Sequence, residues 1–235
     1  MYLPSVSSII IALSFSTALL ASPTDLAQRQ STVRIMALGD SITGSPGCWR
    51  AYLWQKLQQA GIKNTDFVGT LPGQGCGFTY DGENEGHGGY LAVNIASQNL
   101  LPSWLSSTKP DIILMHLGTN DVWNNQSPTT ITSAFSTLLS QMLTSNPRTK
   151  LLVAKIIPMA PSNCAACGAR VVELNKEIER WAGENAAKGG GVAVVDTWTG
   201  FDTQSMTGDG VHPNEKGGRR LADVWYPAVA AAIRG

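Results

Sequence analysis

A run of apolar residues that stops at Gly-Asp-Ser constrains the fold of this chain more than any other stretch. Residues 32–44 read TVRIMALGDSITG, and their apolar part lacks the alternation that is typical of a half-exposed strand. We therefore expect a strand buried on both faces, which Gly39 ends because a small, flexible residue allows a sharp turn. Ser41 then lies at the carboxyl end of a central strand, where open α/β sheets bind their ligands.

The position of Ser41 allows two interpretations. A serine at the end of a buried strand is well placed to act as a nucleophile, but it is also a common helix N-cap. The surrounding residues do not form the G-x-S-x-G nucleophile elbow, because Thr43 stands where the second glycine of that motif belongs. Other parts of the chain must decide between the two interpretations.

Patterns typical of helices and of buried strands alternate beyond Ser41. This alternation predicts a parallel five-stranded sheet covered on both sides, a three-layer α/β/α sandwich. Residues 71–90 are rich in glycine and lack periodicity, so we expect a long functional loop there. Pro102 is expected to cut one helix short and Pro227 to kink the last one. We expect strands at residues 33–38, 66–70, 111–117, 150–157 and 191–197, and helices at residues 49–60, 90–105, 127–146, 171–181 and 214–233.

The balance of charges excludes several classes of partner. The 235 residues contain 17 Lys and Arg and 17 Asp and Glu, so the chain has no net charge at neutral pH. We find neither a basic stripe for nucleic acid nor an acidic tail for a cationic partner, and we expect a neutral ligand. Residues 32–235 are long enough for one domain with a full core. We expect this domain to be a monomer.

The first residues resemble a secretion signal. Residues 9–20 form an apolar core that is too short to span a bilayer, and Ala21 and Ser22 provide small residues for cleavage. We therefore assign residues 1–22 to a signal and residues 23–31 to a polar lead-in, and we expect a secreted, extracellular protein that does not bind membranes. The segment before the apolar core has no Lys or Arg, so an uncleaved N-terminal anchor is the alternative.

The four cysteines fit an oxidising compartment. An even number of cysteines in a secreted chain predicts two disulfides, for which three pairings exist. We favour Cys48 with Cys76, which would fix the loop after Ser41, and Cys164 with Cys167, which would close a tight turn. The alternative for Cys164-Ala-Ala-Cys167 is a redox pair at a strand-to-helix junction, but two prolines precede it in an expected loop.

Two further segments carry residues suited to chemistry. Asn120 follows the third expected strand, at the same edge of a parallel sheet as Ser41, and its amide can donate hydrogen bonds to an oxyanion. Asp209 and His212 are three residues apart in a turn, so the carboxylate can orient the imidazole, which can then accept the proton of Ser41. The alternatives are a turn asparagine and an exposed turn that caps the last helix.

These motifs, in this order, resemble the SGNH or GDSL-type hydrolases over nearly all of residues 32–235. The matching stretches are Gly39-Asp40-Ser41, a loop glycine after the second strand, Gly118-Thr119-Asn120-Asp121 and Asp209-x-x-His212. The resemblance implies a flavodoxin-like fold, a triad of Ser41, Asp209 and His212, and an oxyanion hole. The hole would comprise the N–H groups of Ser41 and a loop glycine and the Asn120 side chain. Ile42-Thr43 replaces the leucine of the family name.

The match offers more than one glycine for the oxyanion hole, since residues 85–90 read EGHGGY. We choose Gly89, which directly precedes an aromatic residue as in the secreted carbohydrate esterases, and Gly88 is the alternative. The same stretch is similar to the acetylxylan esterases of carbohydrate esterase family three. This resemblance implies an acetylated polysaccharide, such as xylan, as the substrate. Aromatic rings suited to sugar faces, or to ordinary packing, are Trp49, Tyr80, Tyr90 and Trp123.

Other functions remain as alternatives. A lipase or thioesterase of short-chain acyl esters would share these motifs, and a catalytically silent module could bind polysaccharide through its aromatic residues. We predict no cofactor and no catalytic metal, because the chain has three histidines and no H-E-x-x-H motif. Of the histidines outside the triad, His116 is expected to be a hydrogen-bonded core residue and His87 to order its loop.

Overall fold

A parallel sheet forms the centre of the molecule in the computed structural model, which describes residues 1, 32–189 and 191–235. The expected secretion signal and lead-in, at residues 1–22 and 23–31, lie outside the described residues except for Met1. Five strands follow the order β2-β1-β4-β5-β6, and a sixth, β3, pairs with β1. The strands are β1 (Val33–Gly39), β2 (Thr65–Val68), β3 (Glu85–Gly86), β4 (Ile112–His116), β5 (Lys150–Lys155) and β6 (Val192–Asp196).

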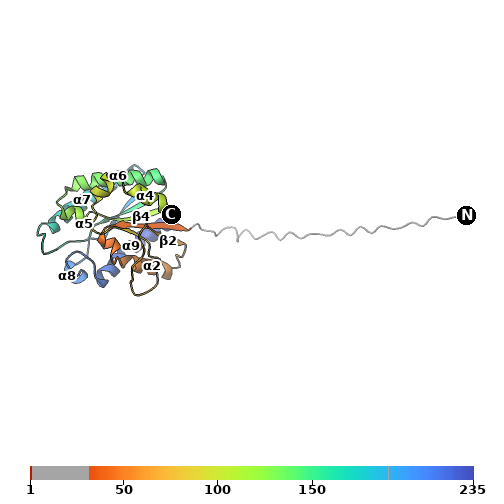
Figure 1. The fold of residues 1–235 in the computed structure, drawn as a ribbon, viewed down its shortest axis with the longest axis horizontal. Coiled ribbons are helices and arrows are strands. Elements are labelled where there is room, and N and C mark those ends of the chain that lie inside the picture. Colours follow the sequence, from red (N-terminus) through yellow and green to blue (C-terminus); the bar gives the residue numbers. More distant parts are fainter. Residues whose placement is uncertain (2–31, 190) are drawn as a thin grey trace. The chain divides into compact units, whose positions relative to one another are not determined.

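The helices cover both faces of this sheet, so the predicted three-layer α/β/α fold is confirmed. In Figure 1, α2 and α9 lie on one side of the strands, and α4, α6 and α7 lie on the other. The two-residue strand β3 was missed because it is too short to show a period. The helices are α1 (Ser41–Gly44), α2 (Trp49–Gln59), α3 (Ala92–Ser97), α4 (Leu101–Thr108), α5 (Thr119–Trp123), α6 (Pro128–Ser145), α7 (Cys167–Ala187), α8 (Thr203–Met206) and α9 (Glu215–Arg234).

Pro102 and Pro227 both lie within helices. The segment expected to be one helix from Tyr90 to Leu105 is two helices, α3 and α4, and Pro102 lies in the first turn of α4. A proline in the first turn costs no hydrogen bond, so Pro102 begins a helix rather than cutting one short. Pro227 stands inside α9, which continues to Arg234.

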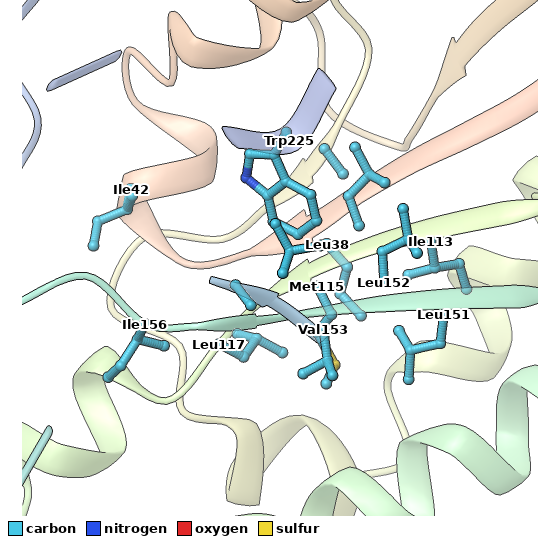
Figure 2. Close-up of a cluster of buried hydrophobic side chains, with 14 of the residues drawn as sticks. Leu38, Ile42, Ile113, Met115, Leu117, Leu151, Leu152, Val153, Ile156 and Trp225 are labelled. Atoms are coloured by element: carbon cyan, nitrogen blue, oxygen red, sulfur yellow. The ribbon is translucent and has the colours of Figure 1, made fainter. Parts of the chain in front are cut away.

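The hydrophobic core lies between the sheet and the helices and excludes water from the central strands. The last five residues of β1 and all five of β4 are buried. Figure 2 shows side chains from these strands and from β5 packed with Trp225 of α9. The ring of Trp225 stacks on Trp49 of α2 with 5.7 Å between centroids, and this contact joins the two helices on that face. The sheet edge that carries Ser41 is therefore held rigidly from both sides.

The structure has both expected disulfides, Cys48–Cys76 and Cys164–Cys167. Cys48 is the N-cap of α2, so the first bridge ties the glycine-rich loop to the segment after Ser41. Cys164 lies in the loop before α7, as expected, and Cys167 is the first residue of that helix, which begins earlier than the expected residue 171. None of the helices in the described ranges is long and apolar enough to cross a membrane.

Candidate active site

Ser41 is the first residue of α1, directly after the end of β1, as the apolar run predicts. Position 39 requires glycine because there is no room for a Cβ atom, and not because the backbone turns there. A Cβ atom there would lie 2.1 Å from the Thr43 hydroxyl and 2.8 Å from the carbonyl oxygen of His116. Only glycine therefore lets α1 fold back against the ends of β1 and β4, which fixes the position of Ser41.

Ser41, His212 and Asp209 form a continuous chain of hydrogen bonds. The Oγ atom of Ser41 lies 2.9 Å from Nε2 of His212, although the two residues are 171 positions apart in the sequence. The other ring nitrogen, Nδ1, lies 2.6 Å from Oδ2 of Asp209. One carboxylate oxygen thus fixes the imidazole, and the remaining nitrogen faces the serine hydroxyl. This is the arrangement that a serine nucleophile requires.

The Asp209 carboxylate is also the organising group of its own turn. Its Oδ1 atom accepts hydrogen bonds from the backbone N–H groups of Val211, at 2.9 Å, and His212, at 2.7 Å. Partial burial acts to raise the pKa of Asp209, but these bonds and the one from the His212 ring outweigh it and lower the pKa to about 2. Asp209 is therefore an anion throughout the neutral and mildly acidic range.

Asp40, next to Ser41, has the opposite environment. Its side chain is completely buried and accepts a hydrogen bond from the N–H of Ile42, which caps α1. Burial raises the pKa of Asp40 to about 6, although the bond from Ile42 opposes this shift. The sequence did not single out this carboxylate as a buried group.

The other side of Ser41 faces the loop between β3 and α3. A Cβ atom on Gly88 would lie 3.8 Å from Cβ of Ser41, whereas one on Gly89 would meet nothing within 4 Å. A side chain at position 88 would therefore meet Ser41, and one at position 89 would meet open space. The N–H groups of Ser41, Gly88 and Gly89 do not donate to another residue in the described part of the chain. All three remain free to bind an oxyanion.

Asn120, in α5, is tied to the same loop. Its Nδ2 atom donates to the carbonyl oxygen of Tyr90 at 3.0 Å, which leaves the second amide hydrogen available. The next residue, Asp121, is buried and accepts hydrogen bonds from the N–H groups of Ala92, at 2.8 Å, and Val93, at 3.1 Å. Asp121 thus caps α3 from a different part of the fold and fixes the loop relative to Asn120.

A buried carboxylate that the sequence analysis missed orders this loop. Glu85 is fully buried and accepts hydrogen bonds from the Thr70 N–H and hydroxyl, at 2.9 and 2.6 Å, and pairs with Nε2 of His87 at 2.6 Å. The His87 ring stacks on Trp104 and on Tyr90, with 4.3 and 4.8 Å between centroids. His87 thus orders the loop, as expected. The sequence signal for this pair was the two-residue spacing of Glu85 and His87, because residues i and i+2 place their side chains on one face of an extended segment.

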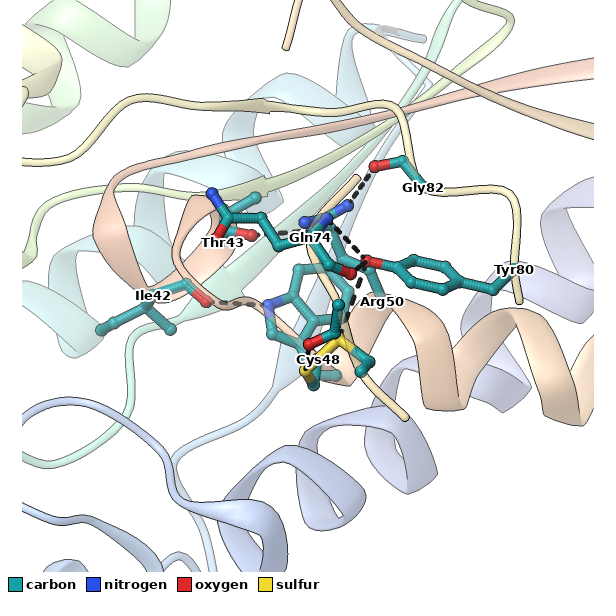
Figure 3. Close-up of a disulfide and its surroundings, with 10 residues drawn as sticks. Ile42, Thr43, Cys48, Arg50, Gln74, Tyr80 and Gly82 are labelled. Atoms are coloured by element: carbon teal, nitrogen blue, oxygen red, sulfur yellow. Dashed lines mark hydrogen bonds between the residues drawn. A yellow bond between two sulfur atoms is a disulfide. The ribbon is translucent and has the colours of Figure 1, made fainter. Parts of the chain in front are cut away.

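Arg50 fixes the remainder of residues 71–90, and nothing in its local sequence indicates that it is buried. Its Nε donates to the carbonyl oxygen of Thr43 at 2.8 Å and its Nη1 to that of Gly82 at 2.6 Å. Figure 3 shows these bonds beside the Cys48–Cys76 disulfide. The glycine-rich segment is therefore held in place by the buried Arg50 side chain, which links it to α1, and by the disulfide, which links it to the start of α2.

The four aromatic candidates lie in different surroundings. Trp49 is 1% exposed, stacked on Trp225, and donates through Nε1 to Ile42, so it packs in the core and offers no face to a sugar. Tyr80 bonds both backbone groups of Gln74 and so closes the disulfide loop (Figure 3). Trp123 packs, partly buried, against the core. Tyr90 alone of the four is exposed, at 40%, close to Gly88.

His116 is a core residue, as expected. It is buried, and its Nε2 accepts a hydrogen bond of 3.4 Å from the N–H of Ile157. Burial lowers the pKa of His116 to about 4, so the ring is neutral at physiological pH. Within the described ranges, no group of three or more His, Cys, Asp or Glu side chains is arranged to bind a metal ion.

A cavity of about 190 Å³ opens beside Ser41 and His212, and we call it the Ser41 hollow. It lies between the segment that leads from α1 to α2 and the start of α9. Its volume is below the roughly 300–1,000 Å³ of pockets that take drug-sized ligands. Its other lining residues are Ile42, Ser45, Pro46, Gly47, Cys48, Trp49, Tyr52, Pro213, Asn214, Glu215 and Gly218.

Comparison with known proteins identifies relatives of this fold and site. A family model described as GDSL-like Lipase/Acylhydrolase matches residues 37–220. A multidomain esterase of Ruminococcus flavefaciens is 29% identical over 251 aligned positions, which cover 95% of this chain and 32% of that protein. This chain thus spans about a third of the length of that curated relative.

Solved structures of esterases are similar over most of the chain. A carbohydrate esterase family 3 protein from Talaromyces cellulolyticus and an acetyl esterase variant with an acetate ion are each 33% identical to this chain, with TM-scores of 0.78. Each match covers 86% of this chain and 98% of the solved chain. These relatives confirm the prediction of a carboxylic ester hydrolase, and the chain belongs to the GDSL-like lipase/acylhydrolase family.

Proposed function

We propose that this protein is a serine esterase that removes acetyl groups from acetylated xylan or a related plant cell-wall polysaccharide. The observation that carries the proposal is the Ser41, His212 and Asp209 chain, with distances of 2.9 and 2.6 Å between successive side chains. A serine hydroxyl is a weak nucleophile at neutral pH and needs a base held in the correct orientation. Ser41, Asp209 and His212 are the catalytic triad in this proposal.

The reaction proceeds in two halves. Ser41 Oγ attacks the acetyl carbonyl carbon while His212 Nε2 takes its proton, and a tetrahedral oxyanion forms. The bond to the sugar oxygen then breaks, and His212 returns the proton to that oxygen, which leaves an acetyl group on Ser41. Water attacks this acetyl-enzyme with His212 again as the base, and acetate departs. Asp209 stays ionised throughout and stabilises the imidazolium.

The oxyanion is bound by donors that surround Ser41. We assign them to the N–H groups of Ser41 and of a loop glycine, Gly89 with Gly88 as the alternative, and to the second amide hydrogen of Asn120. The N–H groups of both glycines have no partner in the described residues. Such fixed donors lower the barrier without the cost of reorganising solvent.

A small, neutral ester group fits this site best. The Ser41 hollow, at about 190 Å³, has room for a short acyl group or a sugar edge and not for a long lipid chain. The solved relatives described as an acetyl esterase and as family 3 carbohydrate esterases favour acetylated carbohydrate. The absence of net charge on the chain agrees with a neutral polymer as substrate.

We further propose that the protein acts outside the cell. The two disulfides are typical of proteins that fold in an oxidising compartment, and a plant polymer is an extracellular substrate. Expression with residues 1–22 in a secreting host tests this. Mature protein in the medium that begins after Ser22 agrees with a cleaved signal, and a cell-bound protein that still begins at Met1 contradicts it.

The decisive experiment measures the acid released from acetylated xylan and from matched short- and long-chain acyl esters by wild type and by Ser41→Ala. We expect acetate from xylan, and a loss of at least about 10⁴-fold in the variant with an unchanged melting temperature. A preference for long acyl chains would make the protein a lipid esterase. If the protein releases acid from none of the esters but still binds xylan, the result would support a binding module instead.

A further inference from the structure

A second hollow, of about 380 Å³, is formed by the loop after β3 and by α3 with its C-cap. We call it the Tyr90 hollow. It adjoins Ser41 through Gly88, which lines it, because a Cβ atom on Gly88 would lie 3.8 Å from Cβ of Ser41. The reaction steps above give no role to the side chains of this hollow. It is lined by Gly88, Gly89, Tyr90, Asn94, Gln98 and Leu100.

Two free amide side chains are the main polar groups of the Tyr90 hollow. Asn94 lies in α3 and Gln98 is its C-cap, so they are one helical turn apart and face the same hollow. Both are exposed, and neither side chain bonds to another residue in the described ranges. Each can donate and accept hydrogen bonds, as the hydroxyl groups of a sugar require.

The aromatic side of the Tyr90 hollow is rigid. One face of the Tyr90 ring lies against His87, which is itself paired with buried Glu85, and the ring remains 40% exposed. A fixed ring with an exposed surface is a platform for the apolar face of a pyranose. The α3 side is equally fixed, because Asp121 caps that helix through the N–H groups of Ala92 and Val93.

The chemistry of the lining selects the class of ligand. None of the lining residues described here carries a charge, which disfavours phosphates, peptides with charged side chains and anionic lipid headgroups. The amides of Asn94 and Gln98 and the Tyr90 ring, next to the backbone of Gly88 and Gly89, suit a neutral sugar. The position next to Ser41 suits a unit that neighbours the acetylated one in a chain.

We propose that the Tyr90 hollow binds a neutral sugar unit adjacent to the acetylated residue, with Asn94 and Gln98 as its hydrogen-bonding groups and Tyr90 as its platform. This inference rests on the proposed function. With this subsite, the activity of the enzyme depends on the length of the sugar chain as well as on the ester. A small aryl acetate, which has no neighbouring sugar, does not use this subsite.

The double variant Asn94→Ala with Gln98→Ala tests the subsite, with Gln59→Ala as a control that removes an exposed amide lining neither hollow. The measurement is kcat/KM on acetylated xylotetraose divided by kcat/KM on an aryl acetate. We expect this ratio to fall about 10-fold or more in the double variant, mainly through KM, because two hydrogen bonds are lost. The ratio of the control should equal that of wild type.

Two results would overturn the subsite. An unchanged ratio shows that neither amide contacts the sugar, and an equal fall on both substrates shows a general effect on the fold. Calorimetry of acetylated xylotetraose with Ser41→Ala, alone and combined with the double variant, separates this proposal from the catalytic one. Weaker binding in the combined variant supports the subsite even if wild type releases no acetate, and equal binding refutes it.

Discussion

Two aspartates stand at the two ends of the catalytic site and differ in almost every respect. Asp40, beside the nucleophile, is fully buried, and burial raises its pKa to about 6. Asp209, beside the base, has 55% of its side chain exposed, and hydrogen bonds outweigh its partial burial and lower its pKa to about 2. The same carboxyl group is thus costly to ionise at one end of the site and easy to ionise at the other.

The difference shows how each end is built. The nucleophile end depends on segments far apart in sequence, since β1, β3 and β4 meet at Gly39. The acid–base end is a self-contained turn in which Asp209 bonds residues two and three positions further on. Its main outside support is the N–H of Ala160, which donates to Gly210 at 2.8 Å. We therefore expect changes to the buried residues that support the nucleophile end to affect stability, and changes at the acid–base end to affect mainly turnover.

After the loss of the nucleophile itself, the largest effect is expected at the exposed end. Asp209→Asn should keep the turn but lose the charge that orients and stabilises the His212 ring, and kcat should fall by about 10³- to 10⁴-fold. The melting temperature should change little, because the carboxylate is largely in solvent. Steady-state kinetics and thermal unfolding of the purified variant measure both. A variant with near-normal turnover would remove Asp209 from the triad.

Asn120→Ala should have the next largest effect. It removes one oxyanion donor and also the bond to the Tyr90 carbonyl, so kcat should fall by about 10²- to 10³-fold. Steady-state kinetics of the purified variant measure the loss. An Asn120→Ala enzyme with near-normal turnover would remove Asn120 from the oxyanion hole.

Asp40→Asn should change how stability depends on pH. The folded state holds the proton of Asp40 more tightly than the unfolded chain does, so wild type loses stability as the pH rises from about 4 towards 7. The variant lacks this loss, and the difference should reach about 2 kcal/mol over that range. Urea unfolding of both proteins at several pH values measures it. Parallel curves would show that Asp40 has the same pKa folded and unfolded.

The smallest expected effect is the difference between the two disulfides in how much stability is lost when each is removed. Cys48 and Cys76 are 28 residues apart and Cys164 and Cys167 only 3, so the first bridge restricts the unfolded chain more. Replacing both members of a pair by Ala should cost roughly 1–2 kcal/mol more for Cys48–Cys76 than for Cys164–Cys167. Denaturant unfolding of the two double variants gives the comparison. The opposite order would mean that the short bridge supports the acid–base end directly.

Features that depend on neighbouring residues could be predicted from the sequence by itself. The periods of apolar residues predict the parallel three-layer fold, because helices and buried strands impose their own spacing on the residues they bury. The three-residue spacing of Asp209 and His212 places both in one turn, and Ser127 and Pro128 mark the start of α6. These inferences need no knowledge of distant segments.

Only the tertiary structure decided features that depend on distant segments. It buries Trp49 on Trp225 and encloses Asp40 and Glu85, which look like ordinary polar residues in the sequence. It also brings Asn94 and Gln98 into one hollow with Gly88 and Tyr90. The physical reason is that burial and contact are set by packing between distant segments, and the spacing of residues within one segment does not encode which side chains that packing encloses.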